Sequence, residues 1–255
     1  MTGPSRSDKT SLDGLNLAPE VRDALERLRE DISVAAGENL AGLILYGGLA
    51  RGRYRGGKSD VNVVVLLRNT AVESLTAIAP ALRAAWRAVR VEPFILKLSE
   101  VQSMTDVFPT KLLDIQAHHI VLMGEDPFVG LEVKREHLRL RIEQELRNIA
   151  LRMRRRYVSI FDDTASLAAA LENVAVSLKV ELGALLRLAG KEEPAENTSA
   201  AVLDRAATAF DLDRDALLRV AAMRRDDSLA SDLPELYDRV LASINRAAEI
   251  ADQME

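Results

Sequence analysis

Two glycines and two polar residues early in the sequence have types and spacing suited to phosphate chemistry. Gly47 and Gly48 follow the apolar segment Leu43–Tyr46, and Asp60 and Asn62 open a second apolar run. Because side chains alternate along a strand, residues 60 and 62 share one face, about 7 Å apart. The amides of a Gly-Gly turn at a helix start can cradle a triphosphate. Oxygen ligands on the neighbouring strand can hold a bridging Mg²⁺, so the spacing predicts a polyphosphate site.

The segment Gly52–Ser59 also satisfies the phosphate-loop pattern GxxxxGK[ST]. A phosphate loop leaves a strand and opens a helix, whose N-terminal amides hold the phosphates. Here the residues after Ser59 are β-branched and favour a strand, and the upstream glycines open the helix instead. We therefore interpret this match as a coincidence.

The order of these features resembles the nucleotidyltransferase superfamily of DNA polymerase β. Its motif is an apolar residue, Gly, Gly or Ser, a gap of about ten residues, then Asp-x-Asp or Asp-x-Glu. The segment Gly47–Gly52, spelled Gly-Gly-Leu-Ala-Arg-Gly, is most similar to the minimal and kanamycin-type members, in which the second residue is usually Ser. The resemblance implies an α+β fold, with a mixed-sheet nucleotidyltransferase domain followed by an all-α helical bundle.

The resemblance also implies roles for individual residues. Gly47 and Gly48 would contact the β- and γ-phosphates, and Arg51 and Ser59 would complete the nucleotide-binding set. Asp60 would ligate Mg²⁺ or Mn²⁺ and take part in catalysis. A nucleoside triphosphate is then the expected substrate.

Asn62 departs from the motif, because it stands where the family has its second acid. Its amide oxygen can ligate Mg²⁺ but brings no charge, so it is compatible with a variant active site and equally with lost catalysis. The family places a third acid on a following strand, as metal ligand or general base. Glu92, in the next expected strand, takes that role. An exposed edge-strand glutamate is the alternative, and Asp114 and Asp126 are further candidates.

Basic residues offer more phosphate contacts. The segment Arg51–Lys58, with Arg53 and Arg55, has four basic residues and no acid, which suits a phosphate clamp or a solvated loop. Between Lys134 and Arg156, nine basic residues face three acids. Such a helix usually presents a solvated face, and it could bind an anionic partner if it borders a cleft. We expect Trp86 to lie in the core.

Composition limits the remaining classes of function. The 255 residues are 48% hydrophobic and 29% charged, which is typical of a folded domain. With no cysteine and only three histidines, thiol chemistry and HExxH zinc sites are excluded. The net charge of −5 argues against nucleic acid as a partner. We find neither a secretion signal nor a membrane-length apolar run and expect a cytoplasmic protein without membrane contact.

Hydrophobic periodicity predicts a mixed region followed by a helical one. The first has helices 19–36, 71–89 and 109–118 and strands 43–46, 60–67, 91–97 and 120–123, with Pro93 indicating an edge strand or a bulge. After a turn at 124–127, an apolar stripe at Leu138, Ile142, Leu146, Ile149 and Met153 precedes helices 164–189, 199–209, 213–224 and 233–253. We expect a mobile tail over 1–17, an α/β domain over 18–130 and a helical bundle over 131–255.

Three functions remain open from the sequence. The first is transfer of a nucleoside monophosphate from Mg²⁺-NTP to a hydroxyl of a small-molecule or protein acceptor. The second is a catalytically impaired nucleotide-binding or partner-binding protein of the same fold, which Asn62 favours. The third is a helical interaction module with a vestigial first half. Relatives of this architecture are often dimers, which leaves a homodimer open.

Overall fold

The computed structural model describes residues 12, 17–52, 54, 59–191, 194, 196, 198–223 and 232–254. Contacts divide the chain into two compact units, Met1–Val133 and Lys134–Glu255, and each is described by itself. The expected tail over 1–17, apart from Leu12 and Leu17, lies outside the described residues. So do Arg53, Arg55, Lys58 and the last residue of the helix expected over 213–224.

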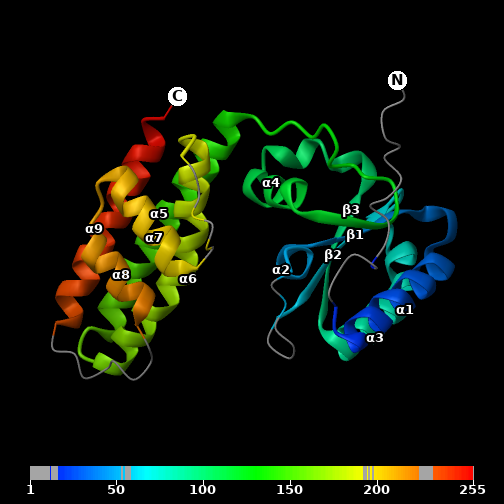
Figure 1. Cartoon of the computed structure of the whole chain (residues 1–255), viewed down its shortest axis with the longest axis horizontal. Coiled ribbons are helices and arrows are strands. Elements are labelled where there is room, and N and C mark those ends of the chain that lie inside the picture. Colours follow the sequence, from blue (N-terminus) through cyan, green and yellow to red (C-terminus); the bar gives the residue numbers. More distant parts are fainter. Residues whose placement is uncertain are drawn as a thin grey trace. The chain divides into compact units, whose positions relative to one another are not determined.

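The first unit is a four-stranded mixed sheet with helices on both faces (Figure 1). The strand order is β3-β2-β1-β4, and β2 and β3 are parallel while β1 is antiparallel to both of its neighbours. The edge position of β3 agrees with Pro93 in its interior. The elements in chain order are α1 (Pro19–Ala36), η2 (Gly37–Asn39), β1 (Leu40–Tyr46), α2 (Gly47–Ala50), β2 (Val61–Leu67), α3 (Val72–Val89), β3 (Val91–Lys97), η3 (Leu98–Glu100), η4 (Ser103–Thr105), α4 (Pro109–Ala117) and β4 (His119–Gly124).

Each face of this sheet has its own hydrophobic core, because successive side chains of a strand point to opposite faces. On one face, Val63 and Val65 of β2 pack in the core formed with α1 and α3. On the other face, Val64 and Leu66 pack in the core that includes Leu112 of α4. Figure 1 shows α1 and α3 together on one side of the strands and α4 on the other. Even-numbered positions of β2 therefore face α4.

Helix α3 corrects one prediction from the sequence. Trp86, expected in the core, has 52% of its surface exposed. The buried residues of α3 include Ile78, Leu82, Ala85 and Val89, a stripe at three- and four-residue spacing. Trp86 comes one residue after Ala85, about a quarter turn away from that stripe, and lies outside the buried face.

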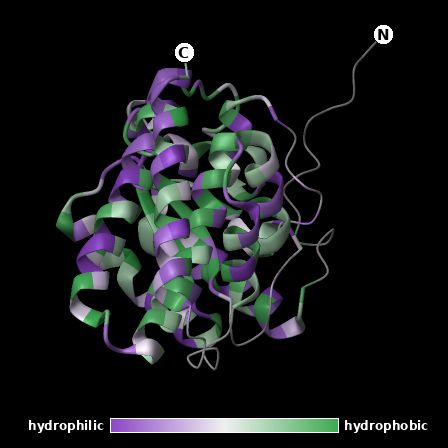
Figure 2. Ribbon diagram, turned by 90° about the vertical axis from the view of Figure 1, so that its left-hand side faces the viewer, coloured by the Kyte–Doolittle hydropathy of each residue, from purple (hydrophilic) through white to green (hydrophobic). Residues whose placement is uncertain are grey.

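The second unit is built of helices, each with hydrophobic and hydrophilic residues around its circumference (Figure 2). The predicted stripe on α5 is confirmed, because all five of its residues are buried. Helix α5 lies against α6 and α9, and the Tyr237 hydroxyl of α9 donates a hydrogen bond of 2.8 Å to the Met153 carbonyl of α5. The helices are α5 (Arg135–Ile160), α6 (Thr164–Leu188), α7 (Ser199–Phe210), α8 (Arg214–Ala222) and α9 (Leu233–Asp252).

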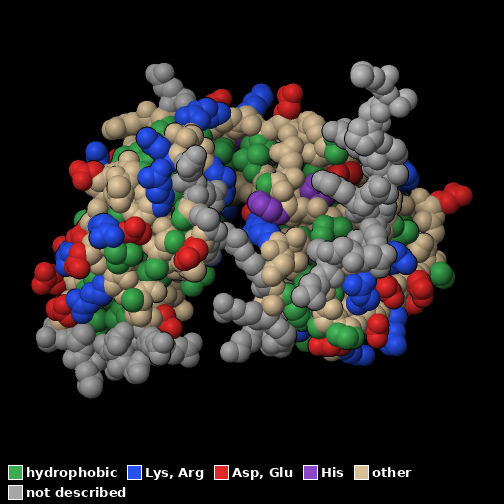
Figure 3. All heavy atoms as spheres, viewed as in Figure 1, with side chains coloured by type: hydrophobic (Ala, Val, Ile, Leu, Met, Phe, Trp, Pro, Cys, Tyr) green, Lys and Arg blue, Asp and Glu red, His purple; other side chains and the backbone are tan. Residues whose placement is uncertain are grey.

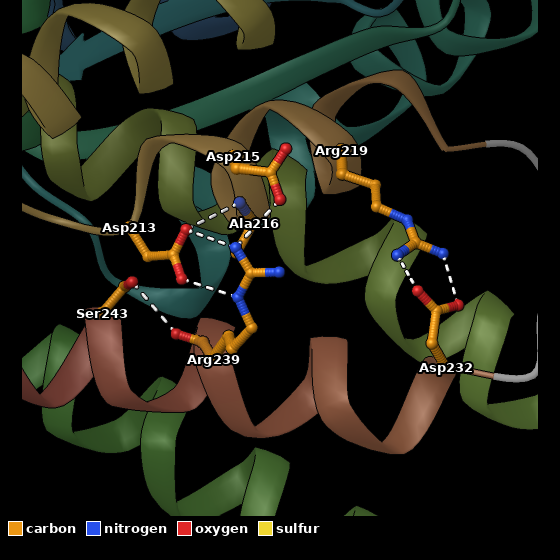
Figure 4. Close-up of polar contacts among 7 residues, drawn as sticks. All are labelled: Asp213, Asp215, Ala216, Arg219, Asp232, Arg239 and Ser243. Carbon is orange, nitrogen blue, oxygen red and sulfur yellow. Dashed lines mark hydrogen bonds and ion pairs between the residues drawn. The ribbon is translucent and has the colours of Figure 1, made fainter.

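Charged side chains join the last two helices of this unit. Figure 4 shows Arg239 of α9 donating to Asp213, the N-cap of α8, at 2.7 and 2.8 Å, and to Asp215 at 2.9 Å. Arg219 of α8 pairs with Asp232, the N-cap of α9. These pairs fix the start of each helix against the other.

The visible surface of the second unit mixes positive and negative side chains (Figure 3). Along α5, Arg147 forms an ion pair of 2.7 Å with Glu143 one turn earlier. The strongly basic helix expected from the sequence thus carries part of its charge in local ion pairs. Within the described ranges, we find no helix long and apolar enough to cross a membrane.

Candidate functional site

A row of polar side chains crosses the sheet of the first unit on the face that carries α4. Asn62 of β2 is the register partner of Glu92 of β3 on one side and of Tyr46 of β1 on the other. Tyr46 in turn pairs with His119 of β4. Register partners point to the same face and neighbouring strands lie about 4.8 Å apart, so these side chains form one line across the sheet. Two predicted site residues, Asn62 and Glu92, are thus direct neighbours.

Gly47 places the start of α2 against this row. Its φ of +76° is a conformation that glycine adopts without strain. A Cβ atom added there would lie 2.9 Å from Nδ2 and 3.4 Å from Cγ of Asn62. The diglycine corner therefore touches Asn62 directly, and the N-cap residue of α2, Tyr46, makes no side-chain capping hydrogen bond.

Asp60 lies two residues before Asn62 and faces a cation, Arg90, from the C-terminal end of α3. The Oδ1 atom of Asp60 is buried and lies 2.9 Å from Nη2 of Arg90, although the pair is not in line for a hydrogen bond. Arg90 also accepts a 3.1 Å hydrogen bond from the Val61 amide to its backbone carbonyl, which aligns the two segments. The carboxylate of the motif thus faces a positive charge supplied by the chain itself.

Arg51 and Ser59, the other two predicted nucleotide-binding residues, do not belong to the row across the sheet. The Arg51 side chain is only 19% exposed, and its guanidinium is paired with the carboxylate of Asp114 on α4. Its Nε atom is buried without a hydrogen-bond partner. Ser59 is partly buried directly before Asp60. Arg51 therefore connects the diglycine segment to α4.

The other acids considered for the third position are already engaged. Asp114 holds Arg51, as described above. Asp126 lies 3.0 Å from Nε2 of His119 and accepts a 3.1 Å hydrogen bond from the Phe128 amide. Glu92, in contrast, is exposed and has no ion pair with any residue in the described ranges. Of these acids, Glu92 alone lies beside Asn62 with its carboxylate available.

Tyr46 belongs to the site although sequence reasoning missed it. Burial raises the pKa of Tyr46, and the negative charges of Asp114 and Glu92 raise it further. Both carboxylates are therefore close enough to act on the phenol electrostatically. The sequence signal that could have indicated Tyr46 is its position directly before Gly47, at the end of an apolar strand.

Asp60 together with Asn62 and Glu92 of the row offers donors of the kind that Mg²⁺ takes. Two carboxylates and one amide are hard oxygen ligands, and Mg²⁺ is commonly bound by one or two carboxylates together with substrate phosphates. The guanidinium of Arg90 lies beside the buried Oδ1 atom of Asp60, so a positive charge can be accommodated there. Among the described residues, we find no group of three or more His, Cys, Asp or Glu that could hold a metal ion.

Comparison with solved structures identifies the fold. The spectinomycin adenyltransferase AAD(9) from Enterococcus faecialis, determined with ATP and spectinomycin, superposes with a TM-score of 0.52 at 13% sequence identity. The match covers 91% of this chain and 99% of that one. The chain has a nucleotidyltransferase fold. At 13% identity, the match shows the fold alone, an α+β domain followed by helices, and it does not show the chemistry of the site.

Sequence comparisons do not detect this structural similarity. No protein-family model matches the chain, and no curated protein matches it either. Within the nucleotidyltransferase fold, the expected order of strands and helices in the first half is confirmed. The roles of the individual site residues remain predictions.

Proposed function

We propose that this protein binds a nucleoside triphosphate with Mg²⁺ in the polar row and transfers its nucleoside monophosphate to a hydroxyl of a small-molecule acceptor. The observation that carries the proposal is the direct contact of Gly47 with Asn62, whose register partner is Glu92. A polyphosphate-binding corner and oxygen ligands thus adjoin one another. The similar adenyltransferase was determined with ATP and spectinomycin, which supports a nucleotide and a small-molecule acceptor.

The diglycine corner, Asp60 and the row residues Asn62 and Glu92 have distinct roles in this proposal. The amides of Gly47 and Gly48 bind phosphate oxygens, and Asp60 and Asn62 hold the Mg²⁺. The ion, when bound, neutralises charge on the phosphates. Glu92 accepts the proton of the acceptor hydroxyl, whose oxygen bonds to the α-phosphorus while pyrophosphate leaves. The exposure of Glu92 permits this role, because the acceptor must reach it from solvent.

A second candidate is nucleotide binding without transfer. Two observations favour it: residue 62 is an amide where the motif has an acid, and the Asp60 carboxylate is held by Arg90. Both reduce the negative charge offered to a metal ion. The kanamycin-type likeness predicted from the sequence would in that case concern architecture only.

One assay separates the two candidates. The protein is incubated with α-labelled ATP, GTP, CTP and UTP and with hydroxyl-bearing acceptors that include spectinomycin, and calorimetry measures nucleotide binding in parallel. Glu92→Gln is the test variant, and Glu100→Gln, an exposed residue after β3, is its matched control. Transfer that only Glu92→Gln abolishes supports the first candidate. Binding without product in the wild type selects the second, and no binding by the wild type overturns both.

A further inference from the structure

Lys111 of α4 lies over the same sheet face as the polar row. Its ammonium nitrogen is 3.6 Å from the ring centroid of Phe94 on β3 and 5.8 Å from that of Tyr46 on β1. Strand β2, with Asn62, runs between these two strands. The ammonium is therefore held by aromatic faces above the sheet, next to the row.

No carboxylate in the described part of the chain pairs with this ammonium. Asp114, one turn along the same helix, is bonded to Arg51, and Asp60 faces Arg90. Burial lowers the pKa of Lys111, which is the effect expected when an ammonium loses water without gaining an anion. The cation–π contacts compensate part of the lost hydration energy, but they leave the N–H donors of the ammonium available.

The amide at position 62 gives a reason for a positively charged side chain beside the row. Nucleotide polyphosphates carry several negative charges, and metal ions held by two acids of the motif normally balance them. With an amide at position 62, one of those acids is absent and a second ion has less support. A fixed lysine nearby can supply the missing charge as a compact cation with three donors.

Given the proposed nucleotide site, we infer that Lys111 binds the polyphosphate. Its charge takes the place of a second divalent ion, beside the one that Asp60 and Asn62 hold, because the amide of Asn62 supports that second ion less than a carboxylate would. The aromatic rings of Phe94 and Tyr46 hold the ammonium in place before the nucleotide arrives. The competing explanation is packing alone, in which the lysine stem covers Phe94 and the charge has no ligand. The two differ in whether the charge of Lys111 affects binding of phosphates.

The test compares affinities for ATP, ADP, AMP and adenosine at fixed Mg²⁺ by calorimetry. Lys111→Met removes the charge and keeps a similar stem. Lys97→Met is the matched control, because Lys97 lies at the other end of β3 and on the opposite face. Lys111→Gln is the second uncharged variant, and the thermal transition of each variant reports whether it folds.

The inference predicts that Lys111→Met weakens ATP binding about tenfold or more, since a hydrogen bond to a charged group contributes about 1.5–3 kcal/mol. Affinity for adenosine stays unchanged, and Lys97→Met binds ATP as the wild type does. Lys111→Gln shows the same loss. Folded Lys111 variants with wild-type ATP affinity would overturn the inference while the proposed function stands. Absence of ATP binding by the wild type would instead overturn the proposed function.

Discussion

A Cβ atom on Gly47 would lie 2.9 Å from the side-chain nitrogen Nδ2 of Asn62, so any larger residue at position 47 would displace the Asn62 side chain at the start of β2. This contact brings together two segments that the sequence separates by the loop before Asp60. It also means that the conformation of Asn62 depends on the corner.

Replacing Gly47 by Ala should therefore disrupt the site more than the fold. Both Gly47 and Gly52 have positive φ, of +76° and +70°, so an alanine at either position costs about 1–2 kcal/mol of backbone strain. At Gly52, no atom lies within 4 Å of the added Cβ. We expect both variants to lose similar stability in chemical unfolding and Gly47→Ala alone to lose nucleotide affinity. Equal nucleotide affinities would show that the contact with Asn62 does not matter for binding.

Asn62→Asp tests whether the amide limits the use of metal. The new carboxylate would adjoin Glu92 and Asp60, so we expect the affinity for Mg²⁺-ATP to rise about tenfold and any transfer to rise with it. The matched control is Asn69→Asp, the same change just beyond the other end of β2. Its side-chain oxygen accepts the Ala71 amide, which aspartate can also do. A variant at position 62 that behaves like this control would contradict the expectation.

Arg90→Gln should release the carboxylate of Asp60. In this structure, Nη2 of Arg90 lies 2.9 Å from Oδ1 of Asp60, so a bound metal ion competes with the guanidinium. Removal of that competitor predicts a lower Mg²⁺ concentration for half-maximal nucleotide binding. Arg87→Gln, an exposed position in the last turn of α3, is expected to leave the Mg²⁺ dependence as it is. The opposite shift in Arg90→Gln would mean that Arg90 itself contributes to nucleotide binding.

Glu181 in the second unit predicts a pH dependence of stability. Its Oε2 atom is buried without a hydrogen-bond partner, and burial, followed by the charge of Glu145, raises its pKa from 4.5 to about 7. Between those two pH values, the folded chain binds more protons than the unfolded one. The free energy of unfolding therefore falls as pH rises through this window, by at most about 1.4 kcal/mol per pH unit, and is level above it.

Glu181→Gln should remove this part of the pH dependence, because a neutral amide does not titrate. Chemical unfolding between pH 4.5 and 8 measures it, with Glu136→Gln on the exposed first turn of α5 as the control. The Gln variant should gain stability relative to the wild type above pH 7. An unchanged slope would place the charge of Glu181 in contact with solvent.

The local parts of the site could be predicted from the sequence, and the long-range parts could not. Gly47 and Asn62 stand at the ends of strongly apolar strands, so periodicity and the motif locate them together. The sequence predicts Glu92 only as the acid of the next expected strand. Arg90 and Lys111 come from a helix end and from α4, and only the packing of those elements brings them to the row. The prediction that Trp86 lies in the core was wrong for a related reason. Its position one residue away from the buried stripe of α3 leaves it exposed.

The most direct test is a crystal structure with a non-hydrolysable ATP analogue and Mn²⁺, whose anomalous signal locates the ion. The account predicts an Mn²⁺ peak bonded to a carboxylate oxygen of Asp60, at the Mg²⁺-like distance of about 2.1 Å, and phosphate oxygens on the amides of Gly47 and Gly48. An ion and polyphosphate bound elsewhere, with Arg90 still on Asp60, would contradict it.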